Sequence, residues 1–311
     1  MPVLSTRSIL KLRADVRTSL RGLFDGLGFL EVDTPVLLEE VLPEPHIEPI
    51  AVPLDGSGRP VHYLQASPEA MMKRLLAAGS GSIYQFARSF RAGERGRWHG
   101  VEFVLLEWYA PGTTLDETAA VLQRLCAETL NTSGFERITC ADAFQKLAGV
   151  DPLTASLDEW REAGQRAGLD LPRSHAAGAD DWFEMILSEV LTPRLGRGRP
   201  TMLESWPASQ AAFAKIDPCD RRIARRFELF VEGVELANGW EEETSREVLR
   251  ERIDAVNQVR AADHRGVLPL PLAFLEAHGD AMPSGVGVAL GFDRLVMLKA
   301  GADSIHDVRC V

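Results

Sequence analysis

The sequence predicts a protein of the α+β class, with helices and strands mixed along one chain. Apolar residues recur at helical spacing between residues 6 and 27. Two apolar runs, Ile83–Phe90 and Val101–Tyr109, have the length and content of strands, and the polar, glycine-containing segment 91–100 joins them. A glycine-rich strand, a turn and a helix follow between residues 284 and 301. Because helices and strands place side chains with different periods, these observations together predict a mixed architecture.

The composition limits the classes of protein to which this chain can belong. It has 311 residues, 45% hydrophobic and 25% charged, which is ordinary for a globular protein. The formal net charge of -11 argues against a broad nucleic-acid-binding surface, which needs clustered positive charge. No apolar run approaches the roughly 18 residues of a membrane span, and the N-terminus mixes charges into its apolar positions, unlike a signal peptide. The four cysteines show no C-x-x-C spacing, so we expect a cytoplasmic protein with reduced thiols and no membrane partner.

The first elements follow from local signals. The helix at 6–27 ends where Gly28 can cap it. FLEVDTPVL (29–37) alternates as one short strand that Pro35 closes. Residues 43–60 are rich in Pro and Gly and are predicted to form a loop.

A second helix is predicted in SPEAMMKRLLAAG (67–79). Ser67 is expected to be its N-cap, with Pro68 at the first helical position and Glu69 behind it.

The rest of the chain divides into a helical and a mixed part. Residues 114–190 are mostly helical with short breaks. RFELFVEGVELANG (226–239) fits either a pair of strands or one long strand. Residues 243–262 form a charged amphipathic helix.

The stretch RSFRAGERGRWHGVEFVLLEWY gathers arginines beside a strand. Side chains alternate faces along a strand, so Phe103, Glu107 and Tyr109 share one face with Val101 and Leu105. A Glu in a strand centre is costly to bury without a cationic partner. A half-solvated antiparallel sheet explains this strand equally well, but arginines present a planar fork that suits phosphate. An aromatic ring, arginines and an inward carboxylate together suit a nucleotide triphosphate beside an amine.

Two carboxylates near the other end of the chain suit a metal ion. VELANGWEEE places Glu235 and Glu242 seven residues apart. Mg²⁺ takes hard oxygen ligands and stays bound to phosphates, so this pair is a candidate magnesium site. The neighbouring Glu241 and Glu243 fit a solvated acidic run.

The last segment, GVALGFDRLVML, places glycines where a backbone passes close to a ligand. Arg294 stands at a helix start, where phosphate is favoured. The segment is not a dinucleotide-binding fingerprint, because no βαβ unit opens the chain.

These stretches resemble the three motifs of class II aminoacyl-tRNA synthetases, and specifically those of the lysyl branch. GFLEVDTPVL is similar to motif 1, FRAGERGRWHGVEFVLLEWY to motif 2 and GVALGFDRLVML to motif 3. The resemblance covers nearly all 311 residues. It implies a mostly antiparallel sheet flanked by helices, and a homodimer formed through motif 1.

Within that family the chain resembles most the short paralogues that ligate (R)-β-lysine to elongation factor P. Motif 1 begins close to the N-terminus, so we expect a single catalytic domain over 1–311, with a mostly helical insertion at about 114–190 and no anticodon-binding domain. SPEAMMKRLLAAG, EFVLLEWY and ELANG also match these paralogues. The resemblance implies ATP and Mg²⁺ as cofactors, lysine or β-lysine as the small substrate and elongation factor P as the protein substrate, with tRNA an unlikely partner.

The resemblance also assigns roles to individual positions. Arg91 and Arg294 would be the catalytic residues, holding the α- and γ-phosphates of ATP, and Phe103 would stack on adenine. The other implied ATP-binding residues are Glu94, His99, Glu235, Leu236 and Gly291. The implied substrate-binding residues are Ser67, Pro68, Glu69, Glu107, Tyr109, Glu242 and Ala289. The implied magnesium ligands are Glu235 and Glu242.

Three positions bear on the kind of enzyme. Ala289 stands where lysyl-tRNA synthetases have Gly and the short ligases have Ala; its methyl group would alter which lysine isomer fits, or would be neutral. In motif 2, Gly93 stands where the family has a Glu that recognises adenine, and Glu94 follows one place later.

Three functions therefore stay open at the level of sequence. The first is activation of (R)-β-lysine or lysine as an aminoacyl-adenylate and its transfer to elongation factor P. The second keeps the adenylation but charges tRNA or another carrier. The third is a non-catalytic paralogue that senses an amino acid, which the altered motif 2 favours.

Overall fold

The chain folds into two compact units in a computed structural model that describes residues 5–54, 56, 62–170 and 178–309. The first unit comprises Met1–Thr114 and Glu242–Val311, and the second comprises Leu115–Glu241. All three motif-like stretches belong to the first unit. The single domain with an insertion at about 114–190 remains a prediction.

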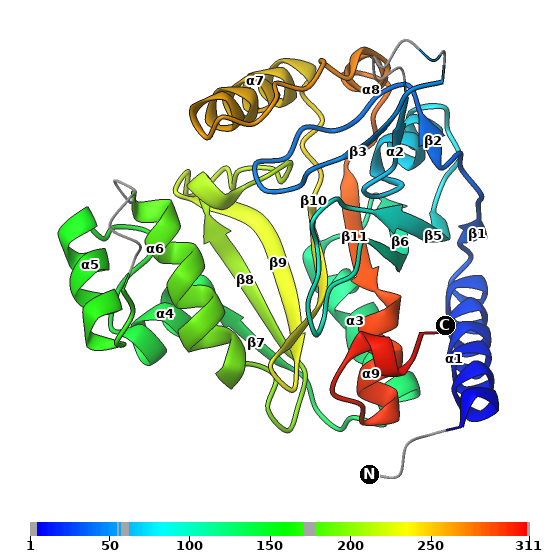
Figure 1. Ribbon diagram of the computed structural model, residues 1–311, viewed down its shortest axis with the longest axis horizontal. Helices are drawn as coiled ribbons and strands as arrows, with labels where there is room; N and C mark the ends of the chain where they lie inside the picture. Colours follow the sequence, from blue (N-terminus) through cyan, green and yellow to red (C-terminus); the bar gives the residue numbers. More distant parts are fainter. Residues whose placement is uncertain (1–4, 55, 57–61, 171–177, 310–311) are drawn as a thin grey trace. The chain divides into compact units, whose positions relative to one another are not determined.

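The first unit contains four strands side by side, in the order β1-β5-β6-β11 (Figure 1). They are β1 (Leu30–Glu31), β5 (Ile83–Phe90), β6 (Glu102–Pro111) and β11 (Gly285–Gly291). β1 pairs with β5 in parallel, whereas β5 with β6 and β6 with β11 are antiparallel. The two strands predicted on either side of segment 91–100 are thus confirmed as neighbours.

The strand predicted from residue 29 up to Pro35 is shorter than expected, and a second strand follows Pro35. Leu30–Glu31 forms β1, and Leu37–Leu38 forms β2 in a separate sheet of order β2-β4-β3. The other two strands of this small sheet are β3 (Ile50–Val52) and β4 (His62–Leu64). The break is explained by Pro35, which has no N–H to donate to a ladder, and by the buried Thr34, whose hydroxyl donates to Gln85 Oε1 at 3.0 Å.

Helix α1 (Thr6–Gly26) covers one face of these strands, as its periodicity predicted. The Ser5 side chain caps its N-terminus. Its buried Phe24 packs on Tyr84 and Trp108, with ring centroids 5.0 and 5.1 Å apart. α1 also contacts α9 (Phe292–Ala300), and the two helices appear together at the lower right of Figure 1. The alternate face of β6 that carries Trp108 is therefore a core face.

Helix α2 (Glu69–Ala77) packs against the same sheet through Met72 and Leu76, which cluster with Ile83 and Tyr109. It also contacts α8 (Leu272–Ala277). The N-cap prediction for this helix was wrong by one residue. Pro68, not Ser67, occupies the cap position, and no side chain donates or accepts a capping bond there.

Helix α7 (Arg246–Ala262) confirms the amphipathic helix predicted at 243–262. The Ser245 hydroxyl caps it by accepting from Val248 N at 3.3 Å.

The second unit contains four strands in the order β10-β9-β8-β7. They are β7 (Glu136–Thr139), β8 (Thr201–Pro207), β9 (Ile223–Val231) and β10 (Val234–Glu241). β7 and β8 are parallel, and the other two pairs are antiparallel. The stretch 226–239 is therefore a pair of strands, which settles the choice that the sequence left open.

Helices supply most of the rest of the second unit, in agreement with the mostly helical prediction for 114–190, of which 171–177 lie outside the described residues. The α-helices are α3 (Leu115–Leu130), α4 (Cys140–Ala148), α5 (Leu157–Arg166) and α6 (Ala179–Ile186). A π-helical turn (Leu187–Leu191) and a 3₁₀ turn (Thr192–Arg194) follow, and further 3₁₀ turns lie at Ala208–Gln210 in this unit and Ile305–Asp307 in the first. α4, α5 and α6 enclose an aromatic core in which Phe144 and Phe183 stack with centroids 4.8 Å apart.

The predicted fold class is confirmed. Each unit combines helices with a mostly antiparallel set of strands, which is an α+β architecture. Within the described ranges, no helix is both long and apolar enough to cross a lipid bilayer.

Candidate active site

A cluster of buried charges lies in the first unit, where α2 faces β6. Lys73 is fully buried and makes two ion pairs, from Nζ to Glu69 Oε1 and to Glu242 Oε2, each at 2.6 Å. Its ammonium also lies 5.9 Å from the ring centroid of Tyr109 and 5.8 Å from that of Phe274. Two carboxylates and two aromatic rings surround the Lys73 ammonium, and they offset the cost of removing its charge from water.

Glu107 and Tyr109 complete this cluster from β6. Both are buried, and the Tyr109 hydroxyl donates to Glu107 Oε2 at 3.2 Å. Glu107 Oε1 is buried and makes no hydrogen bond to any residue that the structure describes. Burial, and next the charge of Glu69, raise the pKa of the Glu107 carboxyl well above its ordinary value. A cation at Oε1 would supply the missing partner.

Strand β11 leaves room for this cluster by carrying glycine and alanine. Gly287 is paired with Tyr109 and Ala289 with Glu107 in the antiparallel register, so they share the face of the cluster. A Cβ at Gly287 would lie 2.2 Å from Glu242 Oε1 and 2.5 Å from Tyr109 Cε1. Only glycine at this position lets the carboxylate and the phenol ring approach as they do.

Arg91 follows directly after β5 and points its guanidinium over the Phe103 ring, with 5.0 Å from its central carbon to the ring centroid. Its Nε is buried and has no hydrogen-bond partner among the described residues. Glu94 Oε1 lies 3.5 Å from Arg91 Nη1, which is a long contact. The adjacent Gly93 has φ +79°, a left-handed conformation that a Glu would adopt only with strain. The change from Glu to Gly in motif 2 thus coincides with a backbone that favours glycine.

Arg294 and His99 lie together, with 2.8 Å between Arg294 Nη2 and His99 Nε2. Arg294 Nε also donates to the Trp98 carbonyl at 3.3 Å. Gly291 is the N-cap of α9, and a Cβ there would meet the Arg294 side chain at 3.3 Å. The start of α9 is fixed by the buried Asp293, whose Oδ2 accepts from Val104 N at 3.0 Å.

These groups fit a nucleotide triphosphate. Two arginines and an imidazole provide donors for phosphate oxygens, and Phe103 provides an aromatic face. The buried, unbonded Nε of Arg91 is the observation that points to an anionic ligand.

The predicted residues Glu235 and Leu236 belong to the second unit, on β10. Glu235 is half-buried and Leu236 is buried. Glu228 lies near Glu235 and is buried. Its Oε1 pairs with Arg226 Nη2 at 2.6 Å. Burial, then the charge of Glu235, raises the pKa of Glu228 to about 8. A pKa of about 8 leaves the Glu228 carboxyl largely protonated at pH 7, and its partner Arg226 is a cation.

The predicted magnesium ligands remain a prediction. Within the part of the chain that the structure describes, no three His, Cys, Asp or Glu side chains form a ready metal site. The carboxylate chemistry of Glu235 and Glu242 suits a hard cation, but Glu242 is already ion-paired to Lys73.

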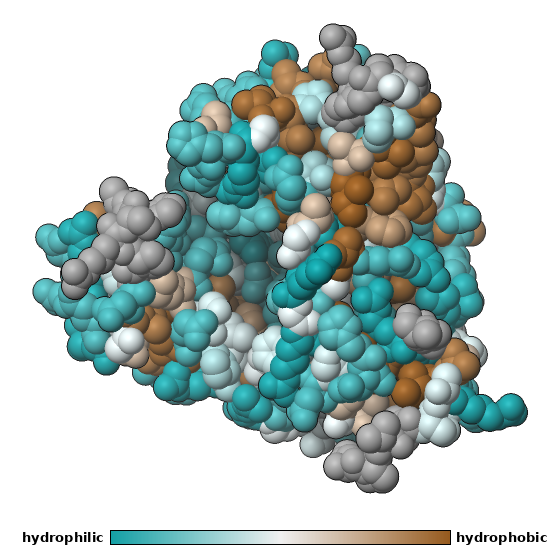
Figure 2. Space-filling model, in the orientation of Figure 1, coloured by the Kyte–Doolittle hydropathy of each residue, from teal (hydrophilic) through white to brown (hydrophobic). Residues whose placement is uncertain are grey.

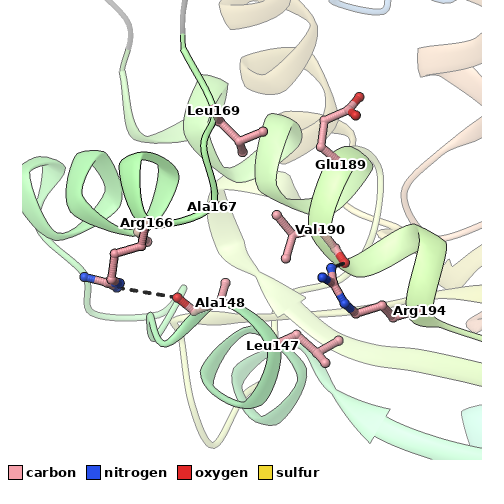
Figure 3. Close-up of a pocket in the computed structure, with 9 residues that line it drawn as sticks. Leu147, Ala148, Arg166, Ala167, Leu169, Glu189, Val190 and Arg194 are labelled. Carbon is pink, nitrogen blue, oxygen red and sulfur yellow. Dashed lines mark hydrogen bonds between the residues drawn. The ribbon is translucent and has the colours of Figure 1, made fainter.

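The second unit contains a pocket with a volume of about 280 Å³. Figure 3 shows its lining residues, which lie near α5 and the π-helical turn. Its wall includes Arg166, Glu189 and Arg194, and Arg166 Nη2 donates to the Ala148 carbonyl at 3.5 Å. None of the residues predicted from the sequence lines it, so it is not part of the candidate site.

The structure brings most of the predicted residues of the first unit into three groups. Glu69, Glu107, Tyr109 and Glu242 form the charged cluster, whereas Arg91 lies with Phe103 and Arg294 lies with His99. Ser67 and Pro68 precede α2 beside Glu69. The sequence reasoning missed Lys73 and Gly287. The four-residue spacing between Glu69 and Lys73 on a helix could have indicated the first, but no local signal indicated the second.

Comparison with known proteins identifies the family of the chain. Residues 4–310 match the family of class II tRNA synthetases (D, K and N). Curated proteins named elongation factor P–(R)-β-lysine ligase, from Enterobacter sp. (strain 638) and Erwinia tasmaniensis, are each 37% identical over 310 residues. These alignments cover 99% of this chain and 95% of each relative, and a protein of the same name from Salmonella paratyphi A matches equally well. The chain therefore belongs to the class II tRNA synthetase family, alongside these ligases.

Proposed function

We propose that this protein is an ATP-dependent ligase that activates (R)-β-lysine, or lysine, and transfers it to a lysine side chain of elongation factor P. The relatives that it matches over nearly their whole length are named for this reaction. The observation that carries the proposal is the buried cluster of Glu69, Glu107 and Glu242, because buried carboxylates in a pocket call for cationic groups such as those of a diamine.

The reaction proceeds in two steps, activation of the amino acid and its transfer to the acceptor lysine. A carboxylate oxygen of the amino acid attacks the α-phosphorus of ATP, forming an aminoacyl-adenylate and releasing pyrophosphate. The amine of the acceptor lysine then attacks the carbonyl carbon, an amide forms, AMP leaves and one proton is released.

The residues of the first unit divide this work. Glu107 and Tyr109, with Glu69 and Glu242, hold the amino groups and orient the carboxylate. Arg91 stabilises the charge that develops at the α-phosphate, as a preorganised donor in a partly buried site. Arg294 and His99 bind the outer phosphates, and Phe103 stacks on the base.

Mg²⁺, when bound, neutralises charge on the phosphates. Glu235 would hold it, as the likeness of ELANG to the family's stretch implies and as a carboxylate ligand suits Mg²⁺. If Glu242 were a second ligand, Mg²⁺ would compete with the Lys73 ammonium for its carboxylate.

Adenine recognition is proposed to depend on Glu94. Gly93 offers no side chain at the family's Glu position, and Glu94 is the neighbouring carboxylate. We expect Glu94→Ala to weaken ATP binding and to reduce the preference for ATP over GTP in pyrophosphate exchange. An unchanged preference would show that another group reads the base.

The proposed assembly is a homodimer that acts in the cytoplasm, where ATP and translation factors occur. Leu27, Leu30 and Leu37, all in or near the motif 1 stretch, are exposed by 39, 60 and 40%. Figure 2 shows hydrophobic residues gathered at the upper right, where Figure 1 places β2. Light scattering on the purified protein tests this: we expect the mass of two chains, and Leu30→Glu should favour the monomer.

The test of the function uses purified protein, ATP, Mg²⁺ and lysine isomers. We expect pyrophosphate exchange that depends on the amino acid, and intact mass spectrometry should show one added residue on elongation factor P. Absence of exchange with every lysine isomer would favour the non-catalytic paralogue. Exchange with label transferred to tRNA and not to elongation factor P would favour the second candidate acceptor.

A further inference from the structure

Lys73 has no role in the reaction described above, yet it occupies the centre of the charged cluster. It is fully buried on α2, one turn after Glu69, and its ammonium bridges Glu69 and Glu242 at 2.6 Å each. A buried lysine is retained only when its charge is matched, so this ammonium and the two carboxylates are interdependent.

The buried charges near the proposed amino-acid site can be counted. Three carboxylates (Glu69, Glu107 and Glu242) and the ammonium of Lys73 leave a net charge of -2 when all are ionised, which for Glu107, with its raised pKa, requires an ammonium beside it. The neighbouring His278 is neutral at pH 7, because burial and then the charge of Lys73 lower its pKa to about 4. Lysine and β-lysine each bring two ammonium groups, and these two groups balance this charge, whereas the substrate carboxylate is the group that attacks ATP and lies outside the count.

We propose that Lys73 is a positioning residue that cancels one of the three negative charges and holds Glu69 and Glu242 in place, so that the pocket matches an amino acid with two ammonium groups. This inference rests on the proposed function. One substrate ammonium is received at Glu107 Oε1, which makes no hydrogen bond to any described residue. The other is received at the Glu69–Lys73–Glu242 bridge, whose remaining charge is -1.

A purely structural ion pair would behave differently. It would stabilise the packing of α2 against β6, and its loss would lower the melting temperature without a selective effect on the amino acid. A positioning role makes the affinity for lysine depend on Lys73 while the affinity for ATP does not.

The first experiment removes the side chain and returns its missing part. Lys73→Ala deletes three carbons and the nitrogen, which together correspond to propylammonium. We expect the variant to bind lysine, measured by calorimetry without ATP, about 100-fold more weakly than wild type, because Glu69 and Glu242 lose the ammonium that holds them in position. Its affinity for ATP should stay within about threefold, and propylammonium should restore lysine-dependent pyrophosphate exchange in a saturable manner.

Two controls accompany this variant. 1-Propanol has nearly the same shape without the charge and should not restore exchange. Arg74→Ala removes the exposed cation next to Lys73 on α2 and should leave lysine binding unchanged. Lysine affinity within a few-fold of wild type in a folded Lys73→Ala variant would overturn the inference.

The second experiment tests the charge count and does not depend on the alanine variant folding. Lys73→Met keeps three buried carboxylates, whereas the double variant Glu69→Gln/Lys73→Met returns the net charge to -2. We expect the double variant to bind lysine at least about tenfold better than Lys73→Met alone, because in Lys73→Met the repulsion between Glu69 and Glu242 moves them apart, and the amide in the double variant removes that repulsion. Equal affinities of the two variants would refute the matching of charge.

The two proposals fail in different ways. A wild-type protein that neither binds a lysine isomer nor supports exchange with one would contradict the proposed function. A wild-type protein that does both, together with Lys73 variants that do so equally well, would contradict this inference alone.

Discussion

Arg91 directly follows β5, where its backbone is hydrogen-bonded and its guanidinium can contact a ligand. Its N–H donates to the Val101 carbonyl at 2.9 Å, while its guanidinium lies over Phe103. We expect Arg91→Ala to lower amino-acid-dependent pyrophosphate exchange by about 10²–10³, as for the loss of one preorganised charged contact, with an unchanged circular dichroism spectrum. Arg88→Ala, which removes an exposed arginine of the same strand, is the matched control. Exchange within a few-fold of wild type would remove Arg91 from the phosphate site.

Glu107 illustrates a residue whose function costs stability. Its pKa is raised in the folded protein by burial and by Glu69, so Glu107 favours folding fully below the pKa of the unfolded chain. This contribution is lost as the pH rises through the folded pKa. An amide resembles the neutral acid, so Glu107→Gln should raise the melting temperature at pH 8 by about 2 °C or more, and the gain should shrink toward pH 5.

The same substitution should abolish lysine binding, because an amide cannot balance an ammonium. Thermal melts at both pH values and calorimetry with lysine measure the two effects. Glu162→Gln, at an exposed position of α5, should change neither. A Glu107→Gln variant that is less stable than wild type at pH 8 would show that the ionised carboxylate is favoured in the ligand-free pocket.

At the scale of elements, α7 is tied to the loop that precedes β3 by one buried side chain. Arg260 is fully buried and donates to the carbonyls of Glu44, Ile47 and Gly266, at 3.2, 3.0 and 3.0 Å. It also pairs with Glu48 Oε2 at 2.7 Å. Since α8 contacts both α7 and α2, this anchor supports the elements behind the charged cluster.

We expect Arg260→Ala to lower the free energy of unfolding by about 2–4 kcal/mol, because several carbonyls lose a buried donor at once. Urea denaturation followed by fluorescence measures the change. Arg250→Ala on the exposed side of the same helix should cost less than about 0.5 kcal/mol. A change of that small size in Arg260→Ala would mean that water replaces the guanidinium without penalty.

At the scale of the whole molecule, charge bears on the choice between acceptors. The formal net charge is -11, and general attraction to a polyanion needs clustered positive charge. We expect the dissociation constant for bulk tRNA at 0.15 M salt to exceed about 10 μM, measured by fluorescence anisotropy with labelled tRNA. Submicromolar binding at that salt concentration would restore tRNA as a candidate acceptor.

Much of the fold could be predicted from local patterns. The helices at 6–27 and 243–262 and the strands on either side of segment 91–100 depend on periodicity within one element, which the sequence carries by itself. The length of β1 and the cap of α2 could not be predicted in this way. Both depend on tertiary contacts, such as the hydrogen bond of Thr34 to Gln85, and on the geometry of single residues such as Pro68.

The sequence by itself determined the class of the protein, its family and the kinds of side chain in its site. Each motif is a contiguous stretch of residues, and the motifs follow one another in a fixed order, so both can be recognised in the sequence alone. Only the tertiary structure decided which charges meet. Glu69, Lys73, Glu107 and Glu242 come from three separate stretches of the chain, and their ion pairs exist because α2 packs on β6 while Gly287 of β11 leaves space for Glu242. Electrostatic energy depends on distances between such segments and on their removal from water, and neither quantity is written in the local order of residues.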